Sequence, residues 1–214
     1  MTAPRNAVIN CGEELNPASA TVDARTSPKM DKKIPGEAGV WIFILGDMSV
    51  FAVFFTVYLS ERSKHRELFD LSQSTLNKNF GAINTMFLLV SSLLVLLAIR
   101  AMRTAQRALA QRLLVGAFLC GLAFIVVKVF EYHERIAAGQ TPPTNGFYLL
   151  YFVLTGLHLF HLVIGMAVLT ALWFLARKPD LSTNQWAFFE GGACFWHMVD
   201  VLWLVLFPLL FLIR

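Results

Sequence analysis

The sequence predicts an all-α membrane protein, a bundle of five transmembrane helices with its N-terminus in the cytoplasm and its C-terminus in the periplasm. Of the 214 residues, 57% are hydrophobic and only 15% are charged, whereas a soluble domain usually carries about 25% charged residues. Several apolar runs approach the roughly 20 residues that a helix needs to cross a bilayer. The net charge of +4 is modest, so no nucleic-acid partner is expected.

The first 34 residues are polar and lack the apolar core of a signal peptide. We expect them to form a flexible cytoplasmic leader. Residues 35–214 would form one membrane domain, and charged or turn-forming segments such as GQTPPTNG and RKPDLSTNQ divide it into spans. The predicted spans are approximately 39–59, 82–99, 113–133, 147–176 and 191–213.

The distribution of basic residues predicts the orientation. The leader and the second and fourth loops carry most of the Lys and Arg, including four arginines between Arg100 and Arg112. Cytoplasmic segments next to membrane spans are enriched in these residues. The first loop is also basic, so the asymmetry is moderate.

An acidic residue interrupts the first span, where Asp47 stands within ILGDMSVF. A charge at mid-bilayer costs at least about 2.5–3.5 kcal/mol on insertion scales. No basic residue lies within one helical turn of Asp47. Any charged partner must therefore come from another helix, and Lys128 is one candidate.

The other spans also carry polar residues, and several lie three positions apart. Such pairs project from one face of a helix, and polar faces in membranes normally point into the bundle or toward a partner protein. We therefore expect an interior polar network, in which Lys128 neutralises Glu131 or Asp47. Its predicted members are Asp47, Lys128, Glu131, His158, His161, Glu190, His197 and Asp200.

Three interpretations of this set are open. The paired carboxylates and imidazoles resemble ligands of di-iron bundles, chained Asp, Glu and His residues serve as proton relays, and buried polar groups also fix helix register. The depths of the residues do not match a di-iron pattern, and the structural role is favoured. A stand-alone transporter or an intramembrane metal-binding protein is the alternative function, although no transporter-type repeat is visible.

Four motifs, in order, resemble the subunit III family of the haem-copper respiratory oxidases over residues 35–214. They are INTMFLLVSS, KVFEYHE, TGLHLFHLVIG and FEGGACFWHMVDVLWLVLF, and in the second Lys128 replaces the usual Gln. The segments PGEAGVWIF and GDMSVFAVFF resemble the NorE-type branch associated with nitric oxide reductase. Relative to long members of the family, the first two helices are absent.

The resemblance implies a non-catalytic accessory subunit of the bacterial inner membrane, with no catalytic residue, no metal ligand and no cofactor of its own. Haem and copper or iron would reside only in its partner, either the catalytic haem-copper subunit I or the catalytic subunit of nitric oxide reductase. The expected role is assembly, stability and proton uptake of that partner in aerobic or denitrifying electron transport. Bound phospholipid is also implied, with contacts expected from Asp47, Trp196, His197 and Trp203.

Overall fold

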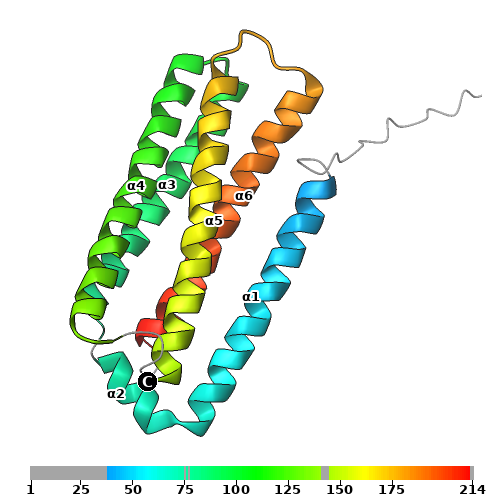
Figure 1. Cartoon of the computed structure of the whole chain (residues 1–214). Helices are drawn as coiled ribbons and strands as arrows, with labels where there is room; N and C mark the ends of the chain where they lie inside the picture. Colours follow the sequence, from blue (N-terminus) through cyan, green and yellow to red (C-terminus); the bar gives the residue numbers. More distant parts are fainter. Residues whose placement is uncertain (1–37, 75, 77, 141–144, 213–214) are drawn as a thin grey trace, which may run out of the picture. The chain divides into compact units, whose positions relative to one another are not determined.

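A computed structural model describes residues 38–212 except 75, 77 and 141–144, so the predicted leader lies outside the described residues. These residues form helices and no strand (Figure 1). The elements are α1 (Ala38–Lys64), α2 (Arg66–Ser74), α3 (Lys78–Arg103), α4 (Arg107–Ala137), α5 (Gly146–Ala176), α6 (Thr183–Phe207) and a π-helical turn (Pro208–Leu212).

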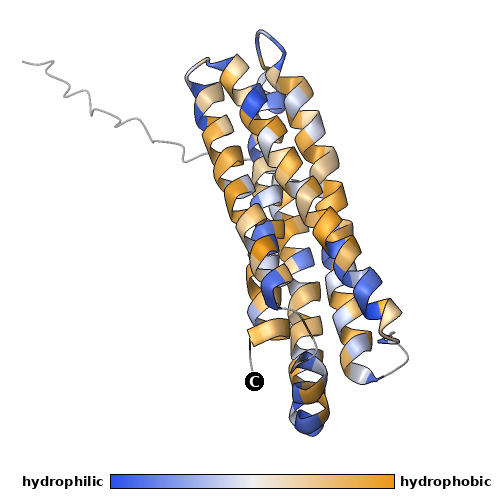
Figure 2. Ribbon diagram, turned by 90° about the vertical axis from the view of Figure 1, so that its left-hand side faces the viewer, coloured by the Kyte–Doolittle hydropathy of each residue, from blue (hydrophilic) through white to orange (hydrophobic). Residues whose placement is uncertain are grey.

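Five of the described helices are long and apolar enough to cross a membrane, which confirms the predicted all-α architecture and number of spans. α1, α3, α4 and α5 each contain a predicted span and extend beyond it at one or both ends, whereas α6 begins before the fifth predicted span, 191–213, and that span ends outside the described residues. Figure 2 shows hydrophobic residues along the helices and hydrophilic residues gathered toward their ends.

The short helix α2 was not predicted, because its many charged and polar residues are typical of a loop. Its anchor is Phe69, which is buried against the rings of Tyr58 and Phe147 at centroid distances of 5.6 and 5.5 Å. Asn145, at the start of α5, also donates a hydrogen bond to Ser72 of α2 at 3.1 Å. These contacts attach the segment after α1 to the bundle.

Local sequence signals set several helix ends. The Asn145 side chain caps α5 by accepting a hydrogen bond from the Tyr148 amide at 3.0 Å. Ser182 and Gln185 form a reciprocal capping box at the start of α6. At the other end of α6, Pro208 lacks the N–H of a regular helix, and the chain continues as the π-helical turn.

Helices α3 to α6 pack against one another, whereas α1 contacts α5, α6 and α2. Close packing of α5 on α6 depends on small residues: a Cβ on Gly165 would lie 2.8 Å from the Trp196 ring. We compared the share of buried residues in the most apolar stretch of each span. This share is 61% in the last span, Thr183–Leu212, but only 11% in α1. The few contacts that α1 makes are therefore important for its attachment.

Candidate functional site

The eight predicted polar residues lie in separate clusters, and no continuous run of described hydrogen bonds joins them. Asp47 meets His161, Lys128 meets Glu131, His197 meets Ser92 of α3, and Asp200, His158 and Glu190 each stand apart from these pairs. The structure thus divides the predicted network among several helix interfaces.

The carboxylate that interrupts α1 faces an imidazole of α5. Asp47 Oδ1 lies 2.8 Å from His161 Nε2, and the two side chains are only 12% and 8% exposed. The partner does come from another helix, as predicted, but it is not Lys128. The other carboxyl oxygen, Oδ2, is buried with no hydrogen-bond partner among the described residues.

The second ring nitrogen of His161 determines how this pair shares its proton. Nδ1 lies 2.8 Å from the Leu157 carbonyl oxygen, which can only accept, so Nδ1 carries a hydrogen and donates it. The short contact with Asp47 then holds one proton, on either Nε2 or the carboxyl. In both arrangements the pair has no net charge, which reduces the cost of its depth in the membrane.

A second cluster contains a buried ion pair within α4, which a tyrosine of α5 joins. Lys128 Nζ lies 2.8 Å from Glu131 Oε2, and the side chains are 1% and 0% exposed. The predicted pairing of these two residues is confirmed. Tyr151 completes the cluster, because its hydroxyl donates to Glu131 Oε1 at 2.5 Å. Sequence reasoning missed Tyr151, although it lies seven residues before His158 on the same face of the helix.

Aromatic rings surround the ammonium group. Lys128 Nζ lies 5.0 Å from the Trp203 ring centroid and 5.3 Å from that of Tyr151. Such cation–π contacts stabilise a cation that has lost its water. Together with Glu131 they explain how a lysine fits inside the helix bundle.

A third cluster connects α3 and α6. Ser92 Oγ lies 2.7 Å from His197 Nδ1. Asp200 is also buried, but its two carboxyl oxygens have no hydrogen-bond partner among the described residues. A serine of another helix, and not Asp200, is therefore the hydrogen-bond partner that the structure gives His197.

His158 and His161 were predicted as a pair, but they point to different neighbours. His158 is fully buried between the rings of Phe124 and Trp203, at 5.6 and 5.2 Å. Neither of its ring nitrogens has a hydrogen-bond partner in the described part of the chain. A spacing of three residues separates side chains by about 60° around the helix, enough to direct His161 to α1 and His158 to α4 and α6.

Glu190 lies outside these interior clusters. It forms an ion pair with Arg103 at 2.8 Å, where the arginine side chain is 61% exposed and the glutamate 16%. The contact joins the C-terminal end of α3 to the N-terminal part of α6. The structure therefore corrects its assignment to the interior network, because the residue is close enough to the end of the bundle to meet a solvated cation.

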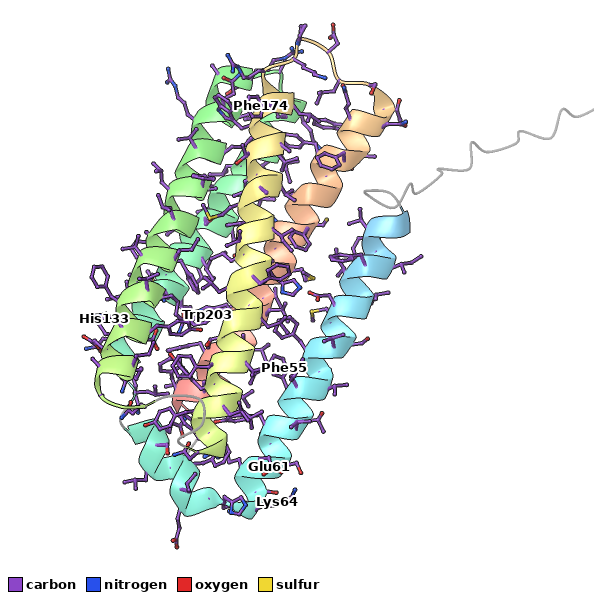
Figure 3. All side chains as sticks on the ribbon, in the orientation of Figure 1. Phe55, Glu61, Lys64, His133, Phe174 and Trp203 are labelled. Carbon is purple, nitrogen blue, oxygen red and sulfur yellow. The ribbon has the colours of Figure 1, made fainter. Side chains whose placement is uncertain are left out.

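The two tryptophans expected to contact lipid are inside the chain. Trp196 and Trp203 have no exposed area (Figure 3 shows Trp203 among the helices). Their indoles donate at 3.1 Å to Ser91 and Thr85, respectively. These hydrogen bonds join α6 to α3. Because both rings are fully buried, neither is accessible to a lipid. Lipid contact by Asp47 and His197 stays a prediction.

An apolar groove lies along α1, α5 and α6. Phe43 of α1, Val168 of α5 and Phe195 of α6 are among the residues that line it. Asp47 follows Phe43 by about one turn of α1. Among the described residues, no three His, Cys, Asp or Glu side chains come together as a set of metal ligands.

Comparison with known proteins gives a consistent result. The family model described as cytochrome c oxidase subunit III matches residues 29–213. Subunit 3 of the cytochrome bo(3) ubiquinol oxidase of Buchnera aphidicola is 27% identical over 174 residues, covering 81% of this chain and 84% of that protein. Cytochrome c oxidase subunit 3 of Alkalihalophilus pseudofirmus is 30% identical, covering 81% and 84%. A haem-copper oxidase subunit I+III of Aeropyrum pernix is 26% identical, covering 82% of this chain and 22% of that protein.

Proposed function

The chain belongs to the cytochrome c oxidase subunit III family, and on this premise we propose that it is an accessory subunit beside the catalytic subunit of a haem-copper respiratory complex. It is a multi-pass protein of the bacterial inner membrane. The family match over residues 29–213 is the observation that carries the proposal. The Aeropyrum pernix relative, named subunit I+III, adds support because it combines the two subunits in one chain.

The partner we propose is the catalytic subunit I of an oxidase or its counterpart in nitric oxide reductase. The segment GDMSVFAVFF of α1 favours the nitric oxide reductase branch, while the relatives described above are named for quinol and cytochrome c oxidases. The two partners differ in the gas that the purified complex consumes, oxygen or nitric oxide.

Within this subunit, the polar clusters would serve mainly to hold the helices together. The Asp47–His161 contact supports this role, because α1 is otherwise sparsely packed and the pair ties it to α5. Proton uptake on behalf of the partner is a second role for the same carboxyl. A phospholipid acyl chain would occupy the apolar groove of α1, α5 and α6, near Asp47.

Co-purification tests the function. A tagged full-length chain, extracted from its native membrane in mild detergent, should retain a haem-containing partner visible in its absorption spectrum. A preparation of folded chain free of haem would contradict the proposal. Stoichiometric iron or manganese in the isolated chain would favour the metal-binding alternative instead.

A variant tests the role of the pair. Asp47→Asn should reduce the recovery of the partner or speed its inactivation during turnover. Ser49→Ala is the matched control, because Ser49 lies two residues away on α1 and its hydroxyl donates to the Leu45 carbonyl of its own helix, its one hydrogen-bond partner among the described residues. Equal behaviour of the two variants would remove the special role proposed for Asp47.

A further inference from the structure

A second groove lies between α4 and α5, at the end where α4 begins and α5 finishes. Phe174, labelled in Figure 3, marks this end of α5. The groove has two adjoining parts that share Val115 and Trp173. Gln111 and Arg112 line the outer part, and the inner part is apolar, lined by Leu114, Phe118, Leu169 and Thr170.

The outer part is basic. Arg112 is exposed at its edge, and the Arg177 guanidinium lies 4.9 Å from the Trp173 ring centroid. In the described part of the chain, neither arginine forms an ion pair, whereas nearby Arg107 lies 3.8 Å from Asp180. The outer part thus has two nearby cations without a carboxylate partner among the described residues: Arg112 lines it, and Arg177 lies against Trp173, which also lines it.

The inner part offers almost no hydrogen-bonding groups. The Thr170 hydroxyl donates to the Met166 carbonyl within α5 at 2.9 Å, so the threonine presents mainly its methyl group. From Gln111 to Phe118 the groove follows about 10 Å of helix, at 1.5 Å per residue. The polar and basic outer part of the groove, its mouth, thus continues directly into the apolar inner part, its apolar channel, which extends along the helices toward the membrane centre.

This gradient matches a phospholipid. The mouth lies at the ends of the spans, where head groups are found and where tryptophans concentrate in membrane proteins. It also lies at the end of the bundle that the basic loops predict to be cytoplasmic, and basic pockets between helices on that side bind anionic head groups. A partner helix would not need a basic mouth and an apolar channel in this order.

We propose that the α4–α5 groove binds one anionic phospholipid, with its phosphate at Arg112 and Arg177 and one acyl chain along Phe118 and Leu169. The site is separate from the groove beside α1 and does not depend on the identity of the catalytic partner. It assigns a preference for negative lipids to this face of the subunit.

Lipid titration of the full-length chain, together with any partner that co-purifies, tests the proposal. The delipidated protein is titrated with phosphatidylglycerol or with phosphatidylcholine of the same acyl chains, and bound lipids are counted by native mass spectrometry. One phosphatidylglycerol should bind more tightly than phosphatidylcholine. Arg112→Gln and Arg177→Gln should each weaken its binding about fivefold, and should weaken phosphatidylcholine binding less, because the choline cation offsets the charge of that lipid's phosphate.

Two further variants separate the charge from the groove. Arg100→Gln removes an exposed arginine at the same end of the bundle but outside the groove, and it should leave binding unchanged. Val115→Trp places a bulky side chain at an exposed position shared by both parts, and it should reduce the binding of both lipids.

Several outcomes would overturn the proposal. Equal affinity for the two lipids would show that charge is not recognised. An equal loss in Arg100→Gln and Arg112→Gln would indicate a general surface effect. Displacement of phosphatidylglycerol by glycerol 3-phosphate at a similar concentration would show that the mouth binds free phosphate and that the apolar channel contributes nothing.

Discussion

Replacing Glu131 with Gln should destabilise the folded chain by about 3–5 kcal/mol, because the change leaves the buried Lys128 ammonium without its carboxylate. The lysine side chain is 1% exposed and lies 2.8 Å from the carboxylate, so water cannot replace the lost partner. The substitution preserves the shape of the side chain, and the Gln oxygen can still accept from Tyr151. The cost therefore reports the unpaired charge and not a cavity.

A double-mutant cycle measures the coupling. Lys128→Met keeps much of the apolar stem and leaves Glu131 unpaired, so we expect it to cost a similar amount, about 3–5 kcal/mol. The double variant leaves no buried charge and only the imperfect pairing of the Gln amide, about 1–3 kcal/mol. The double variant should therefore be more stable than either single variant.

Unfolding by a titration of dodecyl sulfate into mild detergent micelles, followed by tryptophan fluorescence and circular dichroism, gives the four free energies. If the two single changes simply add in the double variant, the residues are not energetically coupled. That result, or a cost below about 1 kcal/mol for Glu131→Gln, would refute the buried ion pair as the source of stability.

Two more predictions concern α5 and use the same unfolding assay. Gly165→Ala should lower the free energy of unfolding by about 1–3 kcal/mol through overpacking, because the new Cβ would lie 2.8 Å from the rigid Trp196 ring. Gly156→Ala is the control: nothing lies within 4 Å of its new Cβ, so the change should be neutral or stabilising by up to about 1 kcal/mol. Equal effects would contradict the close approach. His161→Leu should cost about 1–3 kcal/mol by leaving Asp47 unpaired and should expose α1 to protease, and adding Asp47→Leu should restore protection; no gain in the double variant would argue against the pair.

The sequence alone determined the number of spans and the pairing within one helix. A membrane contains no water for unpaired backbone groups, so a long apolar run has little choice but to form a helix. The Lys128–Glu131 contact was predictable for a similar reason, since residues three apart on a helix are neighbours in any packing. The sequence also showed that a partner for Asp47 had to come from another helix.

Only the tertiary structure decided which polar residues meet across helices. Local spacing does not state how each helix is rotated about its axis or which helix stands beside it. The rotation and the neighbours of each helix bring His161 into contact with Asp47, and Ser92 into contact with His197. They surround His158 with aromatic rings and bring the Tyr151 hydroxyl to Glu131. They also bury Trp196 and Trp203 inside the chain and leave Glu190 with an arginine near the end of the bundle. The polar residues are written in the sequence, but their partners depend on contacts between segments as much as 118 residues apart, as Trp203 and Thr85 are.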